Sequence, residues 1–426
     1  MTGKAGSGII DELRWRGVLA QSTDEDALRA ALDAGPVTFY VGFDPTAPSL
    51  HMGNLVQLVT ARRLQDAGHV PLILVGGSTG LVGDPRMSGE RVLNDPEVVA
   101  SWVQRIAEQV RPFVSFEGPN AARLVNNLDW TAPLSAIEFL RDVGKHFRVG
   151  RMLAKEAVSA RMASDEGISF TEFSYQILQG MDYLELFRRY GCVLQTGGSD
   201  QWGNITSGVD LVHRVEGVSV HALSTALITK PDGTKFGKTE SGTVWLSPEM
   251  TSPYAFYQFW LAAEDAAVDW YLRVFTQRTR EELAALAEET AARPQARAAQ
   301  RVLAQDVTTL VHGAAATARV EAASAALFGQ GDLTALDVDT LGSALAELPT
   351  ARVPVGEPLL VPRLLAEAGV VPSASAGRRA VAEGGAYVNN ERWSDADAPV
   401  DASALLHGRW LVLRRGKRTL AAVDVS

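Results

Sequence analysis

Cysteine is almost missing from this sequence, and its absence excludes several classes of protein. Cys192 is the only cysteine among 426 residues, so an internal disulfide framework is excluded and a reducing, cytoplasmic location is expected. No group of Cys and His has metal-ligand spacing, so we predict no protein-held metal. No apolar run reaches the ~20 residues of a membrane span, and the first 17 residues hold no signal-peptide core. We therefore expect no membrane association.

An excess of positive charge is missing as well. The formal net charge is -10, which argues against wholesale coating of DNA, although a local basic face is enough to bind RNA. Hydrophobic residues make up 46% and charged residues 21%, as in soluble globular proteins. A chain of 426 residues suggests two or three domains, each with enough material for a core.

The most informative stretch is residues 39–55, which read FYVGFDPTAPSLHMGNL. The pattern predicts a strand over 39–43, a loop, and a helix that begins near Ser49. A helix start has free N–H groups and the positive end of the macrodipole, so it can hold phosphate. Gly53 would let a ring or ribose lie against the backbone, and His51 adds a donor. Small nucleotidylyltransferases carry a similar pattern, and a plain strand, turn and helix with a surface His is the alternative.

The fold class follows from the next elements. A second strand, HVPLILVGG, follows the helix and leads into the loop STGLVGDP. Strand, helix and strand of these lengths predict an α/β fold with a parallel sheet covered on both faces. Ligands of such sheets bind at the carboxyl ends of the strands. The loop is neither a dinucleotide fingerprint nor a Walker A motif, so both of those functions are disfavoured.

Two later segments carry polar residues that fit the same edge. A capped helix is predicted from Ser169 to Tyr190, and it places Tyr175, Gln179 and Asp182 on one face, either solvated or lining a pocket. After a further strand, SDQWGNI begins another helix. The sequence KPDGTKFGKTESGT, residues 230–243, is named the lysine loop here. Its lysines suit a polyanion clamp, although a solvated basic loop is the alternative.

The remaining chain changes character twice. Residues 248–330 are Ala-rich with helical spacing and predict a helical domain, and residues 331–358 resemble a linker. Residues 359–426 hold nine Arg and Lys against seven Asp and Glu, in two basic clusters. A basic module on an acidic chain suggests RNA contact through phosphates, and a solubilising domain is the alternative.

Five motifs in order carry a resemblance to a known family: YVGFDPTAPSLHMGNL, GGSTGLVGDP, SYQILQGMDYLELF, QTGGSDQWGNI and KFGKT. Together they closely resemble the bacterial tyrosyl-tRNA synthetases, which are class I enzymes, with HMGN in place of H-I-G-H and KFGKT in place of K-M-S-K-S. The resemblance implies a Rossmann-like catalytic domain over 1–247 with a connective helical insertion at about 91–190. It also implies a helical anticodon-binding domain over 248–330 and an α+β RNA-binding domain over 359–426, similar to a ribosomal protein. Tyrosine activation by ATP and transfer to tRNA(Tyr) would follow.

Site roles are implied by the same resemblance. The expected catalytic residues are His51, Thr46, Lys235, Lys238 and Thr239. The expected tyrosine-binding residues are Tyr40, Asp44, Asp84, Tyr175, Gln179, Asp182, Gln195 and Gln201. The expected ATP-binding residues are Gly42, Thr46, His51, Gly53, Asn54, Gly198, Asp200, Lys235 and Lys238. The expected RNA-binding residues are Arg378, Arg379, Arg414, Arg415 and Lys417. Mg²⁺ would accompany ATP, and a homodimer would form through residues 129–163.

The chain departs from the family pattern at two places. Asn54 stands where the second His of H-I-G-H is usual, and it keeps an amide donor. The loop after Asp84 lacks the family's lysine, so Arg86 and Arg91 are candidates to supply its charge.

Tryptophanyl-tRNA synthetases share the fold, but Tyr40 with Asp182 favours a phenol over an indole. A nucleotidylyltransferase would not need the helical and basic regions, and a non-catalytic RNA-binding protein would not need the intact site.

Overall fold

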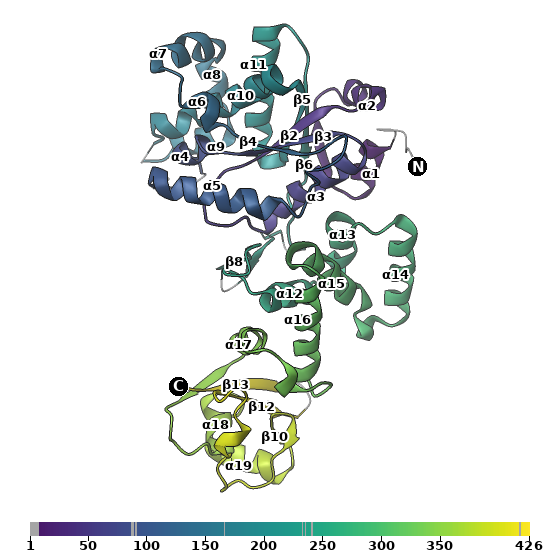
Figure 1. Ribbon diagram of the computed structural model, residues 1–426, viewed down its shortest axis with the longest axis vertical. Coiled ribbons are helices and arrows are strands. Elements are labelled where there is room, and N and C mark those ends of the chain that lie inside the picture. Colours follow the sequence, from purple (N-terminus) through teal and green to yellow (C-terminus); the bar gives the residue numbers. More distant parts are fainter. Residues whose placement is uncertain are drawn as a thin grey trace. The chain divides into compact units, whose positions relative to one another are not determined.

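The computed structural model describes residues 8–86, 89, 92–165, 167–231, 233–234, 236–239, 242–416 and 419–426. It divides into two compact units (Figure 1). Residues 1–250 with 264–299 form the first unit, and residues 251–263 with 300–426 form the second.

A six-stranded sheet is the centre of the first unit. Its strand order is β1-β6-β5-β2-β3-β4, and all neighbours are parallel except β1 with β6. The strands are β1 (Leu19–Ser22), β2 (Thr38–Phe43), β3 (Val70–Val75), β4 (Arg123–Asn126), β5 (Cys192–Gly198) and β6 (His221–Thr225). Strand β3, VPLILV, is buried at every position but its first, as expected for a parallel sheet covered on both faces. The predicted α/β fold is confirmed.

Helices cover both faces of this sheet. Figure 1 shows α10 and α11 on one face, and α3 and α5 on the other. The larger helices of the unit are α1 (Ile9–Trp15), α2 (Glu25–Ala34), α3 (Met52–Asp66), α5 (Pro96–Val110), α10 (Phe170–Tyr190), α11 (Trp202–Glu216), α13 (Asp265–Phe275) and α14 (Arg280–Ala292). Tyr40, Leu72 and Leu74 of the sheet pack with Ile177 and Met181 of α10 in one core.

Short elements connect these larger ones. They are α4 (Thr79–Val82), α6 (Leu128–Thr131), α7 (Ala136–Glu138), the π-helix η1 (Phe139–Val143), the 3₁₀-helices η2 (Gly144–His146), η3 (Ser199–Gln201) and η4 (Pro294–Ala296), α8 (Val149–Leu153), α9 (Glu156–Met162), and the paired strands β7 (Lys238–Thr239) and β8 (Gly242–Thr243).

The chain reverses its direction of travel across the sheet at β2. It goes from β2 to β3 on one side, and β5 later pairs with the other side of β2. In an open parallel sheet such a reversal leaves a crevice at the carboxyl ends of the two strands, where ligands bind. The loop after β2 and the loop after β5 therefore meet at one place, and both carry polar motifs.

The second unit combines helices with a five-stranded sheet. The strand order is β11-β10-β12-β13-β9, antiparallel except for β13 with β9. Its elements are α12 (Pro253–Leu261), α15 (Ala298–His312), α16 (Ala314–Leu327), η5 (Leu333–Ala335), α17 (Val338–Ala346), β9 (Thr350–Val353), α18 (Val361–Glu367), α19 (Ala374–Ala382), β10 (Ala386–Val388), β11 (Glu391–Arg392), η6 (Ala402–Ala404), β12 (Trp410–Arg415) and β13 (Thr419–Val425). Leu364, Leu365, Leu411 and Leu413 lie in its apolar core.

Three segments depend on contacts with residues far away in the sequence. Within the predicted helical region 248–330, α13 and α14 cluster with the first unit and α12 with the second. Residues 331–358 contain α17 and β9, and β9 pairs with β13. Strand β1 lies between α1 and α2 and pairs with β6. A local sequence pattern does not contain such long-range pairing. No helix among the described residues has the length and apolarity of a membrane span.

Candidate active site at the carboxyl end of the parallel sheet

The first turn of α3 holds the H-M-G-N motif in a reciprocal cap. The Nδ1 atom of His51 accepts a hydrogen bond from the N–H of Gly53 at 3.0 Å, and the Oδ1 atom of Asn54 accepts one from the N–H of His51 at 3.0 Å. The side chain of Asn54 therefore caps the backbone N–H of His51 at this helix start, which gives a physical reason for an amide in that position. His51 and Gly53 are exposed, so the positive end of a 15-residue helix faces the crevice.

The lysine loop lies against this first turn. The N–H of Met52 donates to the carbonyl of Val244, and the N–H of Val244 donates to the carbonyl of Gly237. Gly237 has a φ of 78°, and a Cβ there would lie 2.6 Å from the Cβ of Met52, so only glycine fits. Lys235 lies outside the described residues, and only the backbone of Lys238 and Thr239 is described.

A buried carboxylate, Asp182, lies behind this edge of the sheet. It is 1% exposed and accepts hydrogen bonds from Nε1 of Trp130 at 2.8 Å and Nδ2 of Asn127 at 3.0 Å. Burial raises the pKa of Asp182 to about 7, although the two hydrogen bonds oppose that rise. Burial and then the charge of Asp182 raise the pKa of Tyr40 well above its usual value. Tyr40 and Asp182 are thus electrostatic neighbours in a dry site.

Three buried polar atoms near this carboxylate have no hydrogen-bond partner among the described residues. They are the hydroxyl of Tyr40, Oε1 of Gln179 and Oε1 of Gln195. Gln179 lies one helical turn from Asp182, and Gln195 pairs in register with Tyr40 across β5 and β2. Buried polar groups in proteins are nearly always satisfied. A cluster of unsatisfied donors and acceptors therefore fits a polar ligand with an aromatic body.

Asp44 and Tyr175 form a second polar group beside the first. The hydroxyl of Tyr175 donates to Oδ2 of Asp44 at 2.7 Å, and Oγ1 of Thr79 donates to Oδ1 at 2.7 Å. Burial and then the charge of Asp44 raise the pKa of Tyr175 well above its usual value. Asn127 also donates to Thr79 at 2.9 Å, so a continuous chain of hydrogen bonds runs from Asp182 to Tyr175.

Asp84 is the third carboxylate at this edge. Its two oxygens accept from Nε2 of Gln201 at 2.9 Å and Nδ2 of Asn204 at 3.0 Å. The Nζ atom of Lys155 donates to Oδ1 of Asn204 at 2.6 Å. Burial lowers the pKa of Lys155 to about 7, and Asp84 opposes that shift. Two amides thus bond the carboxylate of Asp84, and one of these amides accepts from the half-buried amine of Lys155.

The remaining predicted site residues lie at the rim. Asp200 is exposed and its Oδ1 would lie 2.4 Å from a Cβ on Gly198, so Gly198 makes room for it. Gly42 is exposed at the end of β2. Thr46 and Arg86 line a cleft of about 220 Å³, together with Gly80, Val82, Gly83, Val92, Leu93 and Asn94. Arg91 lies outside the described residues.

The described members of the predicted RNA-binding set differ in their surroundings. Arg378 pairs with Asp397 at 2.6 Å, and the guanidinium of Arg414 lies 4.1 Å from the ring centroid of Tyr387. Arg379 and Arg415 are exposed. Lys417 lies outside the described residues.

Sequence reasoning missed five residues that build the site. They are Thr79, Asn127, Trp130, Lys155 and Asn204. The segment NNLDW follows β4, at the same edge as the loops after β2 and β5. Its polar residues at the carboxyl end of a parallel strand were the available signal.

Comparisons with known proteins agree with this geometry. A family model described as class I tRNA synthetases (W and Y) matches residues 32–329, and one described as the tyrosine–tRNA ligase SYY-like C-terminal domain matches residues 341–423. The tyrosine–tRNA ligase of Streptomyces avermitilis is 67% identical over 419 residues, covering 98% of this chain and 99% of that protein. The tyrosine–tRNA ligase of Acidothermus cellulolyticus is 60% identical, with the same coverage.

Solved structures give the same fold. A C-terminally truncated mitochondrial tyrosyl-tRNA synthetase from Aspergillus nidulans matches with a TM-score of 0.67 and 30% identity, over 73% of this chain and 92% of that one. A tryptophanyl-tRNA synthetase from Encephalitozoon cuniculi, bound to tryptophan, matches with a TM-score of 0.55 and 12% identity, over 74% of this chain and 93% of that one. The second likeness concerns the fold alone.

Proposed function

The chain belongs to the class I tRNA synthetases of the tryptophan and tyrosine group, and we infer that the crevice after β2 and β5 is where its reaction takes place. The activity is that of a tyrosine–tRNA ligase. Tyrosine is activated with ATP to tyrosyl-adenylate and pyrophosphate, and the tyrosine is then transferred to the 3′-terminal adenosine of tRNA(Tyr). The assignments of individual residues below are our proposal.

Tyr40 and Asp182 recognise the phenol of tyrosine by hydrogen bonds. The unsatisfied hydroxyl of Tyr40 and the buried carboxylate of Asp182 support this role more than any other observation. A phenol between them would accept one hydrogen bond and donate the other. Phenylalanine would leave both groups buried without a partner, at a cost of ~1–3 kcal/mol each. Gln195 borders the ring, and Trp130 and Asn127 keep the carboxylate oriented.

The α-amino group of tyrosine lies among Asp84, Tyr175 and Gln179, and Gln201 lies near the carboxylate. Asp44 fixes the hydroxyl of Tyr175, which is how it contributes to this end of the substrate. The rigid amide support of Asp84 favours one orientation of its oxygens. Precise placement of the substrate carboxylate matters because effective concentration depends strongly on geometry.

ATP lies along the start of α3. Gly53 and Asn54 border its ribose side, with Gly42, Gly198 and Asp200, while Thr46 and His51 lie toward the γ-phosphate. A tyrosine carboxylate oxygen forms a bond to the α-phosphorus as the bond from that phosphorus to the bridging oxygen of pyrophosphate breaks. The carboxylate is already ionised at pH 7, so no general base is needed. Positioning and charge stabilisation do the catalysis, and Lys235, Lys238 and Thr239 stabilise the departing pyrophosphate.

Mg²⁺ is the metal we propose to accompany ATP. It prefers oxygen ligands, which the triphosphate itself supplies. The described residues hold no group of three or more His, Cys, Asp or Glu side chains arranged as a metal site. The substrate would therefore bring its own ion.

A homodimer is the proposed assembly. Apolar side chains are exposed in and around the segment expected to form the interface, namely Leu128, Ile137, Leu140, Val149, Leu153, Met162 and Phe170. Ile137 and Phe170 are each 70% exposed, which is unusual for a surface that faces only water. Light scattering of the Ile137→Asp variant should show monomer where the unaltered chain shows dimer.

We also propose a cytoplasmic location, where tRNA charging takes place.

The second unit is proposed to contact tRNA through its exposed arginines. Replacing Arg379 and Arg415 together by Ala should weaken tRNA charging and flatten its salt dependence, while adenylate formation stays unchanged. Arg378→Ala is the matched control, because that guanidinium is already paired with Asp397. Equal loss in both reactions would count against an RNA contact.

The reaction itself is tested by exchange of labelled pyrophosphate into ATP. Tyrosine should support exchange at low concentration, while tryptophan and phenylalanine should support little. Exchange driven equally by phenylalanine would contradict the proposed reading of the phenol.

A further inference from the structure

The lysine loop rests on the aromatic surface of α13. The ring of Phe236 lies 4.7 Å from the ring of Tyr271 and 5.7 Å from that of Phe275, and it is nearly parallel to Phe275 at 23°. The hydroxyl of Tyr271 donates to the carbonyl of Thr229 at 3.0 Å. Helix α13 thus holds the loop at two points, just before Lys230 and next to Lys235.

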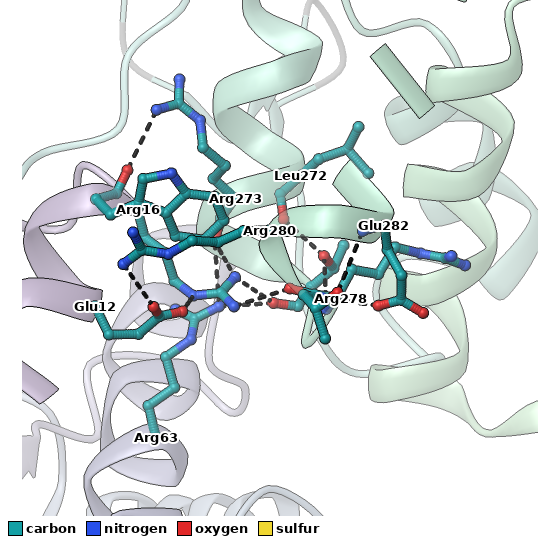
Figure 2. Close-up of polar contacts among 11 residues, drawn as sticks. Glu12, Arg16, Arg63, Leu272, Arg273, Arg278, Arg280 and Glu282 are labelled. Carbon is teal, nitrogen blue, oxygen red and sulfur yellow. Dashed lines mark hydrogen bonds and ion pairs between the residues drawn. The ribbon is translucent and has the colours of Figure 1, made fainter. Parts of the chain in front are cut away.

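Helix α13 is in turn fixed at its C-terminal end by two buried arginines (Figure 2). Arg16 donates to the carbonyls of Arg273 at 2.7 Å, Thr276 at 3.1 Å and Arg278 at 2.9 Å. Arg63 donates to the carbonyls of Thr276 at 2.8 Å and Arg273 at 3.3 Å. The last carbonyls of a helix lack internal partners and carry its negative end, so guanidinium groups suit them.

Arg63 makes this connection specific to α3. It lies in the last turn of the helix whose first turn is H-M-G-N, and it is 5% exposed. Burial and then the nearby Arg16 lower the pKa of Arg63 to about 9. Arg16 pairs with Glu12 at 2.7 Å, whereas no carboxylate among the described residues forms an ion pair with Arg63. If α13 moved away from α3, a buried cation would lose its acceptors, so the arrangement is held in one position.

One helix therefore contacts both the lysine loop and α3, the two elements that the proposed function places around the triphosphate. Its aromatic face holds the lysine loop, and its C-terminal carbonyls are bound to the far end of the ATP helix. At the other end of α3, Gly237 of the lysine loop lies directly against Met52. The described part of the lysine loop, α3 and α13 therefore each contact the other two.

We propose that α13 sets the position of the lysine loop over the start of α3, and that Tyr271 and Phe236 are positioning residues for departure of pyrophosphate. The proposal rests on the proposed function of Lys235 and Lys238. Those lysines act only where their ammonium groups reach the leaving group, and small displacements in such sites reduce rates strongly. The described contacts of Tyr271 and Phe236 include each other, Phe275 and Thr229, so in this proposal they act through the lysines.

The test is the Tyr271→Phe variant of the full chain. It keeps the ring that packs against Phe236 at a tilt of 48° and removes only the hydroxyl that donates to the carbonyl of Thr229. The maximal rate of tyrosine-dependent pyrophosphate exchange should fall ~5-fold, the effect of one buried hydrogen bond, while KM for tyrosine stays within ~2-fold. The control is Tyr254→Phe, a tyrosine of similar burial in the other unit, and it should leave the rate unchanged.

A second pair of variants distinguishes a positioning effect from simple loss of folding. Phe236→Ala should lower the rate ~10-fold or more, and Phe236→Leu should restore part of it, with the same thermal midpoint as the unaltered chain. A rate within 2-fold for both Tyr271→Phe and Phe236→Ala, while Lys238→Ala is slow, would overturn the role of α13 and leave the lysines in place. A normal rate for Lys238→Ala would overturn the lysine function itself. A rise in KM for tyrosine without loss of rate would also overturn the proposal.

Discussion

Trp130→Phe tests the proposed electrostatics of the tyrosine pocket. The change keeps an aromatic ring under the guanidinium of Arg189 but removes the N–H that donates to Asp182 at 2.8 Å. A hydrogen bond to a charged group contributes ~1.5–3 kcal/mol, and one pKa unit corresponds to ~1.4 kcal/mol. The lost bond stabilised the ionised form, so the pKa of Asp182 should rise by ~1–2 units from about 7.

The higher pKa would change the ionised fraction of Asp182 near neutral pH. At pH 7.5 the ionised fraction of Asp182 should fall from roughly three quarters to roughly a quarter or less. A neutral carboxyl accepts the phenol's hydrogen bond less strongly than a carboxylate does. We therefore expect kcat/KM for tyrosine to fall ~3–10-fold at pH 7.5, and the acidic limb of its pH profile to move ~1–2 units upward. KM for ATP should not change.

The assay is pyrophosphate exchange at subsaturating tyrosine between pH 6 and 9. Trp260→Phe is the control for loss of a buried indole, because Trp260 is 0% exposed and belongs to the other unit. A profile for Trp130→Phe that stays in place, or that moves toward acid, would refute the assignment of Asp182 as an ionised acceptor.

Three further predictions follow from buried or strained groups. Lys155→Gln should raise KM for tyrosine. Because burial lowers the pKa of Lys155 to about 7, the charged amine destabilises the folded state fully below pH 7, and this destabilisation fades as the pH rises toward the usual lysine pKa of 10.5. The free energies of unfolding of the variant and the unaltered chain, from urea titrations, should therefore converge at alkaline pH. Gly237→Ala adds a Cβ that would lie 2.6 Å from that of Met52, at a φ of 78°, so stopped-flow adenylate formation should slow ~10-fold or more while equilibrium tyrosine binding is kept. Arg63→Gln should lower the free energy of unfolding by about 2 kcal/mol, while its neighbour Arg62→Gln, 43% exposed and paired only with Asp66, should change it by less than about 0.5 kcal/mol.

Local physics explains which parts of the site were predictable. A helix start was predicted near Ser49, and the structure places the N-cap at His51. The prediction came this close because the cap is local: Asn54 and His51 are three residues apart. The face of Tyr175, Gln179 and Asp182 follows from helical periodicity, since i, i+4 and i+7 lie above one another. The parallel sheet follows from apolar strands alternating with helices.

The partners of these residues were not predictable by the same means. Trp130 and Asp182 are 52 residues apart, and Asp84 and Asn204 are 120 apart. Such pairs depend on how β4, α10 and α11 pack, and no single local pattern contains that information. No pattern in the sequence distinguishes Lys155, and the fold places its amine, half-buried, against Asn204.

The same distinction applies to the positions of individual segments. Strand β9 is four residues long, and it is stabilised by parallel pairing with β13 at the other end of the second unit's sequence. Helix α13 resembles its neighbours in composition, but its C-terminal carbonyls are bound by arginines from the first 63 residues. Both positions are set by long-range contacts, so a composition-based division at 248 or 331 could not find them.

The central claim is that Tyr40 and Asp182 read the phenol, and Tyr40→Phe tests it most directly. The variant keeps the ring that packs edge-on against Tyr183 at 5.3 Å and removes a hydroxyl with no hydrogen-bond partner among the described residues. The ratio of kcat/KM for tyrosine over phenylalanine should fall ~5–10-fold, while thermal stability of the free protein is kept or raised. An unchanged ratio would contradict the claim.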